Sequence, residues 1–266
     1  MRKWLVVCVP LPFFSMMWAA CSSSPTGSDG GADVTVTDSA TMDKKVIPDV
    51  GMMEAAATCP TPASSIDTSM IQWVPPVTPN PTACTATQAS TYFDDCWGTS
   101  SSSTLCNAFT GSSANTACAA CLSTASTASA YGVIVVYTGI GYDNQAGCVA
   151  VEMGDLSSTG CGAKIQAVTQ CENLACLTNC PVTDQASLTL FQQCAAAADM
   201  GVCSQYATAA NAGACNLADS GADGAAQAGA ICESATDFQG LYNAISPVFC
   251  GDYTPADAGD AGADSD

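Results

Sequence analysis

Eighteen cysteines are distributed through a chain of 266 residues, and they limit its fold more than any other feature. Cys8 lies inside an apolar leader and Cys21 ends it, which leaves an even number in the rest of the chain. In an exported protein, an even set of cysteines indicates a disulfide framework. The sixteen that remain are Cys59, Cys84, Cys96, Cys106, Cys118, Cys121, Cys148, Cys161, Cys171, Cys176, Cys180, Cys194, Cys203, Cys215, Cys232 and Cys250. We expect them to form disulfides whose pairing the spacing leaves open.

Disulfides explain these cysteines better than zinc sites do. Thiolates could in principle bind zinc, but the export signal and the scattered spacing favour disulfides. Each disulfide typically stabilises a fold by about 2–4 kcal/mol. That contribution suits a chain whose apolar residues are largely alanine rather than leucine, isoleucine and phenylalanine.

The N-terminus has the composition of an export signal. Arg2 and Lys3 precede an apolar segment, residues 4–20, which falls short of the ~20 apolar residues that a membrane-spanning helix needs. The segment ends in "WAAC", which resembles a bacterial lipobox with Trp18 in place of the usual leucine. We therefore expect residues 1–20 to be a lipoprotein signal peptide and Cys21 to carry the acyl chains. The alternative is a protein secreted without lipid.

Composition divides the remainder into three parts. Residues 21–57 are rich in Ser, Gly, Thr and Asp, and we expect them to form a disordered acidic tether. Residues 58–252 form the cysteine-rich domain, and residues 253–266 form a disordered acidic tail. Ser22 follows the lipidated position, as in lipoproteins sorted to the outer membrane. We expect the bacterial cell envelope as the location and the membrane as a partner.

Charge excludes several classes of function. The chain has 24 acidic residues, five basic residues and no histidine. Nucleic-acid binding needs clustered Lys and Arg, so we expect none. Without histidine there is no Ser-His-Asp or Cys-His catalysis and no histidine-ligated metal, and we expect no cofactor. The acidic segment "NLADSGADG", residues 216–224, lacks the order of ligands of a calcium-binding EF-hand, so we assign no metal site.

The hydrophobic pattern predicts a mainly α domain with one short strand or hairpin at about residues 131–152. Thr85 is a helix cap, and Asn115 could cap the helix that carries the next cysteine pair. Residues 130–142 are continuously apolar and β-branched, which predicts one buried strand. Residues 144–155 follow as a short helix or a partner strand. Residues 234–250 place apolar side chains on one helical stripe.

Two cysteine clusters admit further interpretations. Cys118 and Cys121 have thioredoxin-type spacing, but a loop and a helix cap precede them instead of a strand. We favour a structural role for both and keep a thiol–disulfide function as an alternative. In residues 171–180, the spacing puts Cys176 and Cys180 on one helical face and indicates a helix end cross-linked to its neighbours.

A carboxylate-based enzyme is a further alternative. Its candidate residues are Asp94, Asp95, Glu152, Asp155 and Glu172, with Lys164 as an amine nucleophile. Asp94 and Asp95 are adjacent and would point in different directions on a helix. Glu152 and Asp155 are better spaced, although loop and cap roles are commoner at such positions, and a solvated helix lysine is the default for Lys164. We assign no catalytic residue.

The order of cysteine-containing segments resembles that of a known group of proteins. The segments "ACTATQASTYFDDC", "NTACAACL", "YGVIVV", "NQAGCVAVE", "QCENLACLTNCPVTD" and "FQGLYNAISPVFCG" cover most of residues 82–251. They are similar to cysteine-rich exported proteins and lipoproteins of the myxobacterial type. The resemblance implies export, lipidation and a disulfide framework, and it implies no activity. The function expected from the sequence is a lipid-anchored binding or structural module for an unknown protein or surface ligand.

Acylation at Cys21 is directly testable. Cells that express the full chain and are fed an alkyne-bearing fatty acid should label the wild-type protein, because the apolar segment ends in a lipobox-like cysteine. The Cys21→Ser variant should not be labelled, since it lacks the thiol that accepts the first lipid. Equal labelling of the two proteins, measured by in-gel fluorescence after click coupling, would contradict the assignment.

Overall fold

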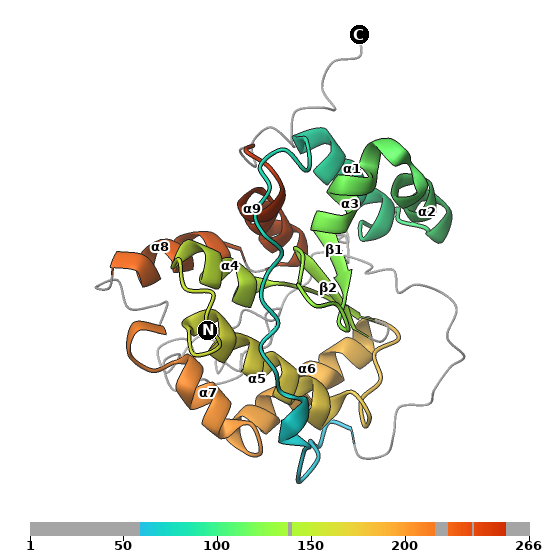
Figure 1. The fold of residues 1–266 in the computed structure, drawn as a ribbon. Helices are drawn as coiled ribbons and strands as arrows, with labels where there is room; N and C mark the ends of the chain where they lie inside the picture. Colours follow the sequence, from blue (N-terminus) through green and yellow to red (C-terminus); the bar gives the residue numbers. More distant parts are fainter. Residues whose placement is uncertain (1–58, 138–139, 216–222, 236, 254–266) are drawn as a thin grey trace, which may run out of the picture.

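A computed structural model describes residues 59–137, 140–215, 223–235 and 237–253 of the chain (Figure 1). The predicted signal peptide, Cys21 and the tether lie outside the described residues, as does nearly all of the tail. The segment considered for calcium binding lies largely outside them as well.

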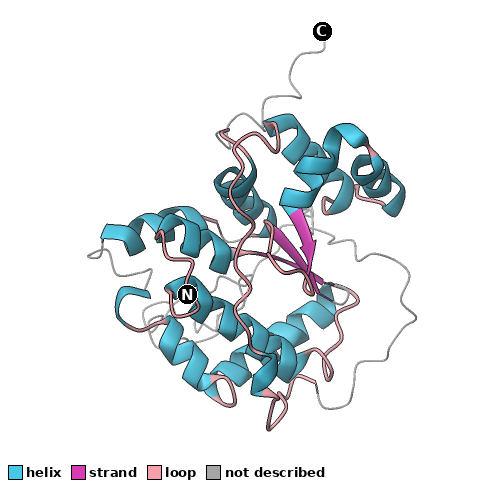
Figure 2. Cartoon of the chain, in the orientation of Figure 1, coloured by secondary structure: helices cyan, strands magenta, loops and turns pink. Residues whose placement is uncertain are grey.

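Helices dominate the described residues and surround one small sheet (Figure 2). The α-helices are α1 Ala86–Cys96, α2 Ser103–Gly111, α3 Thr116–Leu122, α4 Gln145–Glu152, α5 Cys161–Cys176, α6 Gln185–Met200, α7 Ser204–Ala210, α8 Asp223–Cys232 and α9 Phe238–Cys250. The 3-10 turns are η2 Thr68–Met70, η3 Ser113–Asn115 and η4 Gly213–Cys215, and the strands are β1 Ser123–Ala125, β2 Ile134–Tyr137 and β3 Ile140–Asp143. The predicted mainly α fold with a short hairpin is confirmed.

The sheet corrects one detail of the sequence interpretation. Tyr137 pairs with Ile140, so the chain reverses direction inside the segment expected to be a single strand. Strand β2 therefore pairs antiparallel with β3 in a hairpin, and it pairs parallel with β1 on its other side, with Ser123 opposite Ile134. The segment after the hairpin is helix α4, whose cap Asn144 accepts a hydrogen bond from the Gly147 N–H.

Local capping explains where several helices begin. Thr85 accepts a hydrogen bond from the Gln88 N–H, and the Gln88 side chain accepts one from the Thr85 N–H, which forms the predicted cap of α1. Asp184 forms a similar reciprocal cap at α6. Asn115 was expected to cap α3 but does not, because its side chain donates to the Phe109 carbonyl and accepts from Gln88.

The helices form two groups on either side of the sheet. Figure 1 shows α1, α2, α3 and α9 at one end of the molecule and α5, α6 and α7 at the other. The first group, together with α4, α8 and β2, forms the larger core, in which Tyr92, Phe93, Tyr242 and Phe249 are buried. The Phe93 and Tyr242 rings lie 5.0 Å apart, and the Tyr242 hydroxyl donates to the Ala89 carbonyl at 2.7 Å. This interaction joins α9 to α1.

Eight disulfides cross-link these elements. Five of them join two helices, or a helix and a 3-10 turn. Two join a helix to the residues just before another helix, and the eighth joins the start of the described chain to the segment after α5. The pairs are Cys59–Cys180, Cys84–Cys118, Cys96–Cys106, Cys121–Cys250, Cys148–Cys232, Cys161–Cys215, Cys171–Cys203 and Cys176–Cys194. The predicted disulfide-rich character is confirmed. Helix α5 and the turn after it hold four of the sixteen half-cystines, as expected for a cross-linked helix end.

Close packing of α4 on α5 generates a stability prediction. A Cβ at Gly162 would meet the Ala146 carbonyl oxygen and lie 2.6 Å from the Ala150 Cβ, both on α4. Gly162→Ala should therefore destabilise the protein by about 1–3 kcal/mol through overpacking. Denaturant unfolding with the disulfides intact measures this change.

The matched control is Gly111→Ala at the exposed end of α2, where a Cβ would meet nothing within 4 Å. This substitution should change the free energy of unfolding by less than about 1 kcal/mol. Equal stability of the two variants would show that the α4–α5 contact is looser than described.

Candidate functional site

An extended segment crosses the molecule between the two groups of helices. We call residues 71–81 the strap; it runs from the end of η2 to the approach to α1, beside α5 and the sheet (Figure 1). Four prolines lie in it, and their fixed φ and missing N–H suit an extended chain that is not the centre of a sheet. The strap lies outside regular secondary structure, and hydrogen bonds attach it to α5 on one side and to Tyr131 and α9 on the other.

Two glutamines of α5 fix one end of the strap. The Gln166 side chain accepts from the Val74 N–H at 2.7 Å and donates to the Val74 carbonyl at 2.9 Å. Gln170 makes the same pair of bonds with Gln72, at 2.9 and 2.8 Å. Residues four apart on a helix are neighbours about 5–6 Å apart, and alternate residues of an extended chain are separated by a similar rise of about 6.6 Å. The helix therefore presents two amides in register with the strap backbone.

Tyr131, which precedes β2, and α9 fix the other end. The Val77 N–H donates to the Tyr131 carbonyl, and the Tyr131 N–H donates to the Pro75 carbonyl, both at 2.9 Å. The Asn80 N–H then donates to the Phe249 carbonyl at 2.7 Å. Because the strap is neither a helix nor a strand of the sheet, its backbone N–H and carbonyl groups need other hydrogen-bond partners, and these contacts supply them.

A small hollow lies beside the strap, between the start of α4 and helix α5. It is lined by Tyr131, Tyr142, Asp143, Asn144, Gln145, Ala146, Ile165, Gln166 and Thr169. Its volume open to a water-sized sphere is about 20 Å³. Because one water needs about 10–15 Å³ by this measure, the hollow holds one or two waters and no metabolite.

Tyr131, Asn144 and Gln166, which line the hollow, already have hydrogen-bond partners within the protein. The Tyr131 hydroxyl donates to the Ser126 carbonyl at 2.7 Å, and burial raises the pKa of this phenol. The Asn144 amide donates to the Tyr131 carbonyl at 3.2 Å and caps α4 with its oxygen. Gln166 holds the strap on both of its polar atoms. These groups therefore position backbone and are not presented to a ligand.

The candidate carboxylates occupy different parts of the fold. Asp94 and Asp95 lie on α1, at the far end of the molecule from α5 (Figure 1). Asp94 is exposed and its neighbour half-buried, and partial burial raises the pKa of Asp94. Glu152 is the last residue of α4, whereas Glu172 is buried inside α5 with 1% of its surface exposed. The structure therefore does not bring these four side chains into one concave site.

Asp155 and Lys164 interact across the turn that precedes α5. Hydrogen bonds from Ser157 lower the pKa of Asp155, and the Lys164 charge adds a smaller effect in the same direction. Lys164 itself is half-buried in the first turns of α5, and its Nζ lies 3.7 Å from the Cys215 Sγ. Sequence reasoning singled out both residues but could not show this contact with a disulfide.

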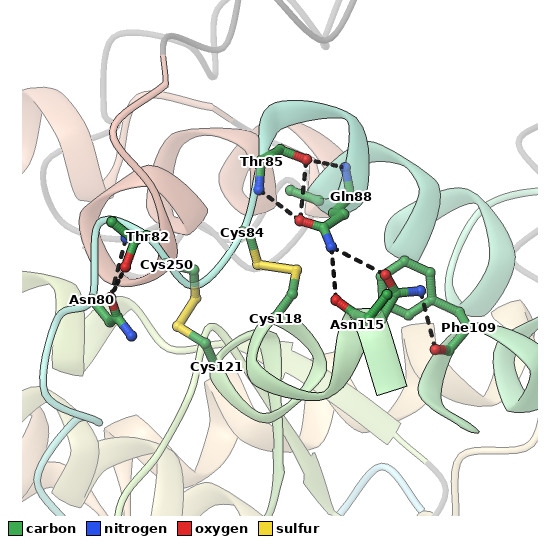
Figure 3. The surroundings of a disulfide bond; sticks show 12 residues. Asn80, Thr82, Cys84, Thr85, Gln88, Phe109, Asn115, Cys118, Cys121 and Cys250 are labelled. Carbon is green, nitrogen blue, oxygen red and sulfur yellow. Dashed lines mark hydrogen bonds between the residues drawn. A yellow bond between two sulfur atoms is a disulfide. The ribbon is translucent and has the colours of Figure 1, made fainter. Parts of the chain in front are cut away.

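The CAAC cysteines are not partners of one another. Cys118 pairs with Cys84, and Cys121 pairs with Cys250 (Figure 3). Cys118 has no exposed surface and Cys121 is 7% exposed. A redox disulfide between Cys118 and Cys121 therefore does not fit this pairing, and both residues fasten α3 to its neighbours.

The described residues contain neither a candidate metal cluster nor a candidate membrane-spanning helix. No group of three or more His, Cys, Asp or Glu side chains in that part of the chain could hold a metal ion. Within the same residues, no helix combines the length and the apolar character that crossing a bilayer requires.

Comparison with known proteins identifies no relative. No family model, curated protein or solved structure matches the chain. The resemblance to myxobacterial exported proteins therefore remains a prediction from the sequence.

The strap yields a second stability prediction. Gln166→Leu removes both partners of Val74 and leaves its N–H and carbonyl without their hydrogen bonds. Loss of these part-buried bonds should destabilise the protein by about 1–3 kcal/mol and make residues 71–81 easier to cleave. Denaturant unfolding and limited proteolysis with mass spectrometry measure the two effects.

Gln193→Leu on the exposed face of α6 is the matched control, since this side chain is open to solvent. Its effect should stay within about 0.5 kcal/mol. If both glutamine variants behave alike, the amide bonds do not hold the strap.

Proposed function

We propose that the chain is a lipid-anchored protein of the bacterial cell envelope whose cross-linked head serves as a binding or structural module. The predicted lipid on Cys21 attaches the chain to the membrane, and the acidic tether, residues 21–57, separates the head from the bilayer. The outer membrane is the expected location.

The disulfide framework is the observation that carries this proposal. Eight disulfides in one chain form and persist in an oxidising compartment and are rare in the cytoplasm. Cys121–Cys250 and Cys59–Cys180 close the longest loops, with sequence separations of 129 and 121 residues. Such cross-links restrict the unfolded chain most strongly and so stabilise the folded head.

The geometry favours this function over the two alternatives. An enzyme based on the candidate carboxylates would need them to converge, yet Asp94 and Asp95 lie on α1 while Glu172 is buried in α5. A thioredoxin-like pair would need Cys118 and Cys121 joined to one another, whereas each is joined to a different partner. A rigid head with a held strap needs neither arrangement.

Charge limits the partners of such a module. The chain carries 24 acidic residues, and removal of the leader would take Arg2 and Lys3 with it. The resulting negative field repels nucleic acids and other polyanions and attracts cationic surfaces. We therefore expect the unknown protein or surface ligand to be neutral or basic where it meets the head.

Counting thiols tests the proposal. The full-length protein, extracted from membranes with detergent and without reductant, should take up no polyethylene-glycol maleimide when it is denatured. After reduction it should take up sixteen, because the framework holds sixteen half-cystines and Cys21 is blocked by lipid. Gel shifts report both counts.

The Cys21→Ser variant serves as the control for the anchor. It should lack the lipid and keep its unprocessed leader, so Cys8 adds one thiol and the two counts become one and seventeen. Labelling of the wild type before reduction would show a reducing compartment and would contradict the proposal.

A further inference from the structure

One disulfide in the described residues has a cation in contact with it. The Lys164 ammonium lies 3.7 Å from the Cys215 Sγ, and Cys215 is bonded to Cys161. Lys164 is also the one Lys or Arg among the residues that the structure describes. An ammonium at this distance stabilises a thiolate and lowers the pKa of the corresponding thiol. If the disulfide opens, the Cys215 sulfur is therefore a good leaving group.

The other sulfur also lies where a thiolate is favoured. Cys161 is the first residue of α5, a helix of 16 residues, and Gly160 before it offers no side-chain cap. The free N–H groups at the start of a helix favour negative charge nearby. The Asp155 carboxylate lies against Gly160. Its negative charge opposes the effect of the helix N-terminus and makes a thiolate at Cys161 less favourable.

Access separates this disulfide from most of the others. Cys161 is 8% exposed and Cys215 is 4% exposed, so each residue of the pair has some contact with solvent. In five other pairs, at least one cysteine has no exposed surface. These pairs are Cys84–Cys118, Cys121–Cys250, Cys148–Cys232, Cys171–Cys203 and Cys176–Cys194. Two pairs are more open: Cys59–Cys180, in which Cys59 is half-buried, and Cys96–Cys106, which is half-buried at both ends. Neither has a cation contact among the described residues.

We propose that Cys161–Cys215 is a thiol–disulfide exchange site, with Lys164 stabilising the leaving sulfur. An external thiolate attacks the Cys161 Sγ, the S–S bond breaks, and its electron pair stays on Cys215 as a thiolate beside Lys164. Cys161 then holds a mixed disulfide with the external thiol. A second external thiolate attacks the external sulfur of that bond and releases the Cys161 thiolate. Two external thiols become one disulfide, and their two protons go to Cys161 and Cys215.

Opening this bond leaves the rest of α5 fastened. Cys171–Cys203 and Cys176–Cys194 still join the helix to the start of α7 and to α6. The bond that opens holds η4 to the first turn of α5. Exchange therefore releases one local attachment while the fold remains cross-linked. The partner is a small thiol or a protein dithiol of the envelope.

The test measures the reduction rate of each disulfide in the full-length protein. Native protein is incubated with glutathione at fixed pH, and samples are quenched with N-ethylmaleimide and mapped by peptide mass spectrometry. Wild type is compared with Lys164→Gln, Lys164→Arg and Asp155→Asn. Lys164→Gln should slow labelling of Cys161 and Cys215 by about threefold or more, because the leaving thiolate loses its counter-charge.

The direction in which the reduction rate changes distinguishes loss of the Lys164 charge from a general loss of stability. A variant that merely loosens the fold would expose several disulfides and speed their reduction together. Lys164→Arg should keep the wild-type rate, and Asp155→Asn should raise the rate at this pair alone. The rates at Cys96–Cys106 and Cys171–Cys203 should be unchanged in all variants. A Lys164→Gln rate at Cys161–Cys215 that equals or exceeds the wild-type rate would overturn the proposal.

Discussion

Cross-linked cysteines hold the helices together where a larger protein would use leucine and isoleucine. The core between α5, α6 and the turn before α7 consists of five half-cystines, two alanines and Phe191. Alanine offers little apolar area, and hydrophobic stabilisation scales at about 25 cal/mol per Å² buried. The covalent bonds therefore supply what the small side chains of this core do not, each by about 2–4 kcal/mol. The positions of α5, α6 and α7 relative to one another depend on them.

Local patterns in the sequence were sufficient for the features that depend on neighbouring residues. The Thr85 cap and the buried stripe of α9 need no distant partner, and both were predicted. The cap expected at Asn115 failed because Gln88, 27 residues away, takes its side-chain oxygen. Strand β1 has three small or polar residues and no hydrophobic alternation, so its sequence gives no strand signal. Helix α2 was missed for a similar reason, since serines and glycine surround it.

The strap shows why the candidate site was harder to predict than the fold. Gln166 and Gln170 have helical spacing, and a polar residue in a helix is ordinarily assigned to solvent. Their backbone partners lie 92 and 98 residues earlier in the chain, a separation over which no sequence pattern operates. Disulfide pairing has the same difficulty, because sixteen cysteines permit very many connectivities. The residue types therefore predicted a disulfide-rich helical domain, whereas the long-range contacts could be identified only from the structure.

Redundant cross-links change what a single disulfide can do. If α5 depended on one bond, that bond could not open without loss of the helix, and selection for stability would leave it inert. Helix α5 instead carries Cys161, Cys171 and Cys176, each bonded to a different element. Two of these bonds lie in the fully buried core, and the third lies at the helix N-terminus in contact with Lys164. In an acidic protein, a thiolate would ordinarily be disfavoured by neighbouring carboxylates. The Lys164 ammonium offsets that penalty at Cys161–Cys215, and opening this bond leaves α5 joined to α6 and to the start of α7.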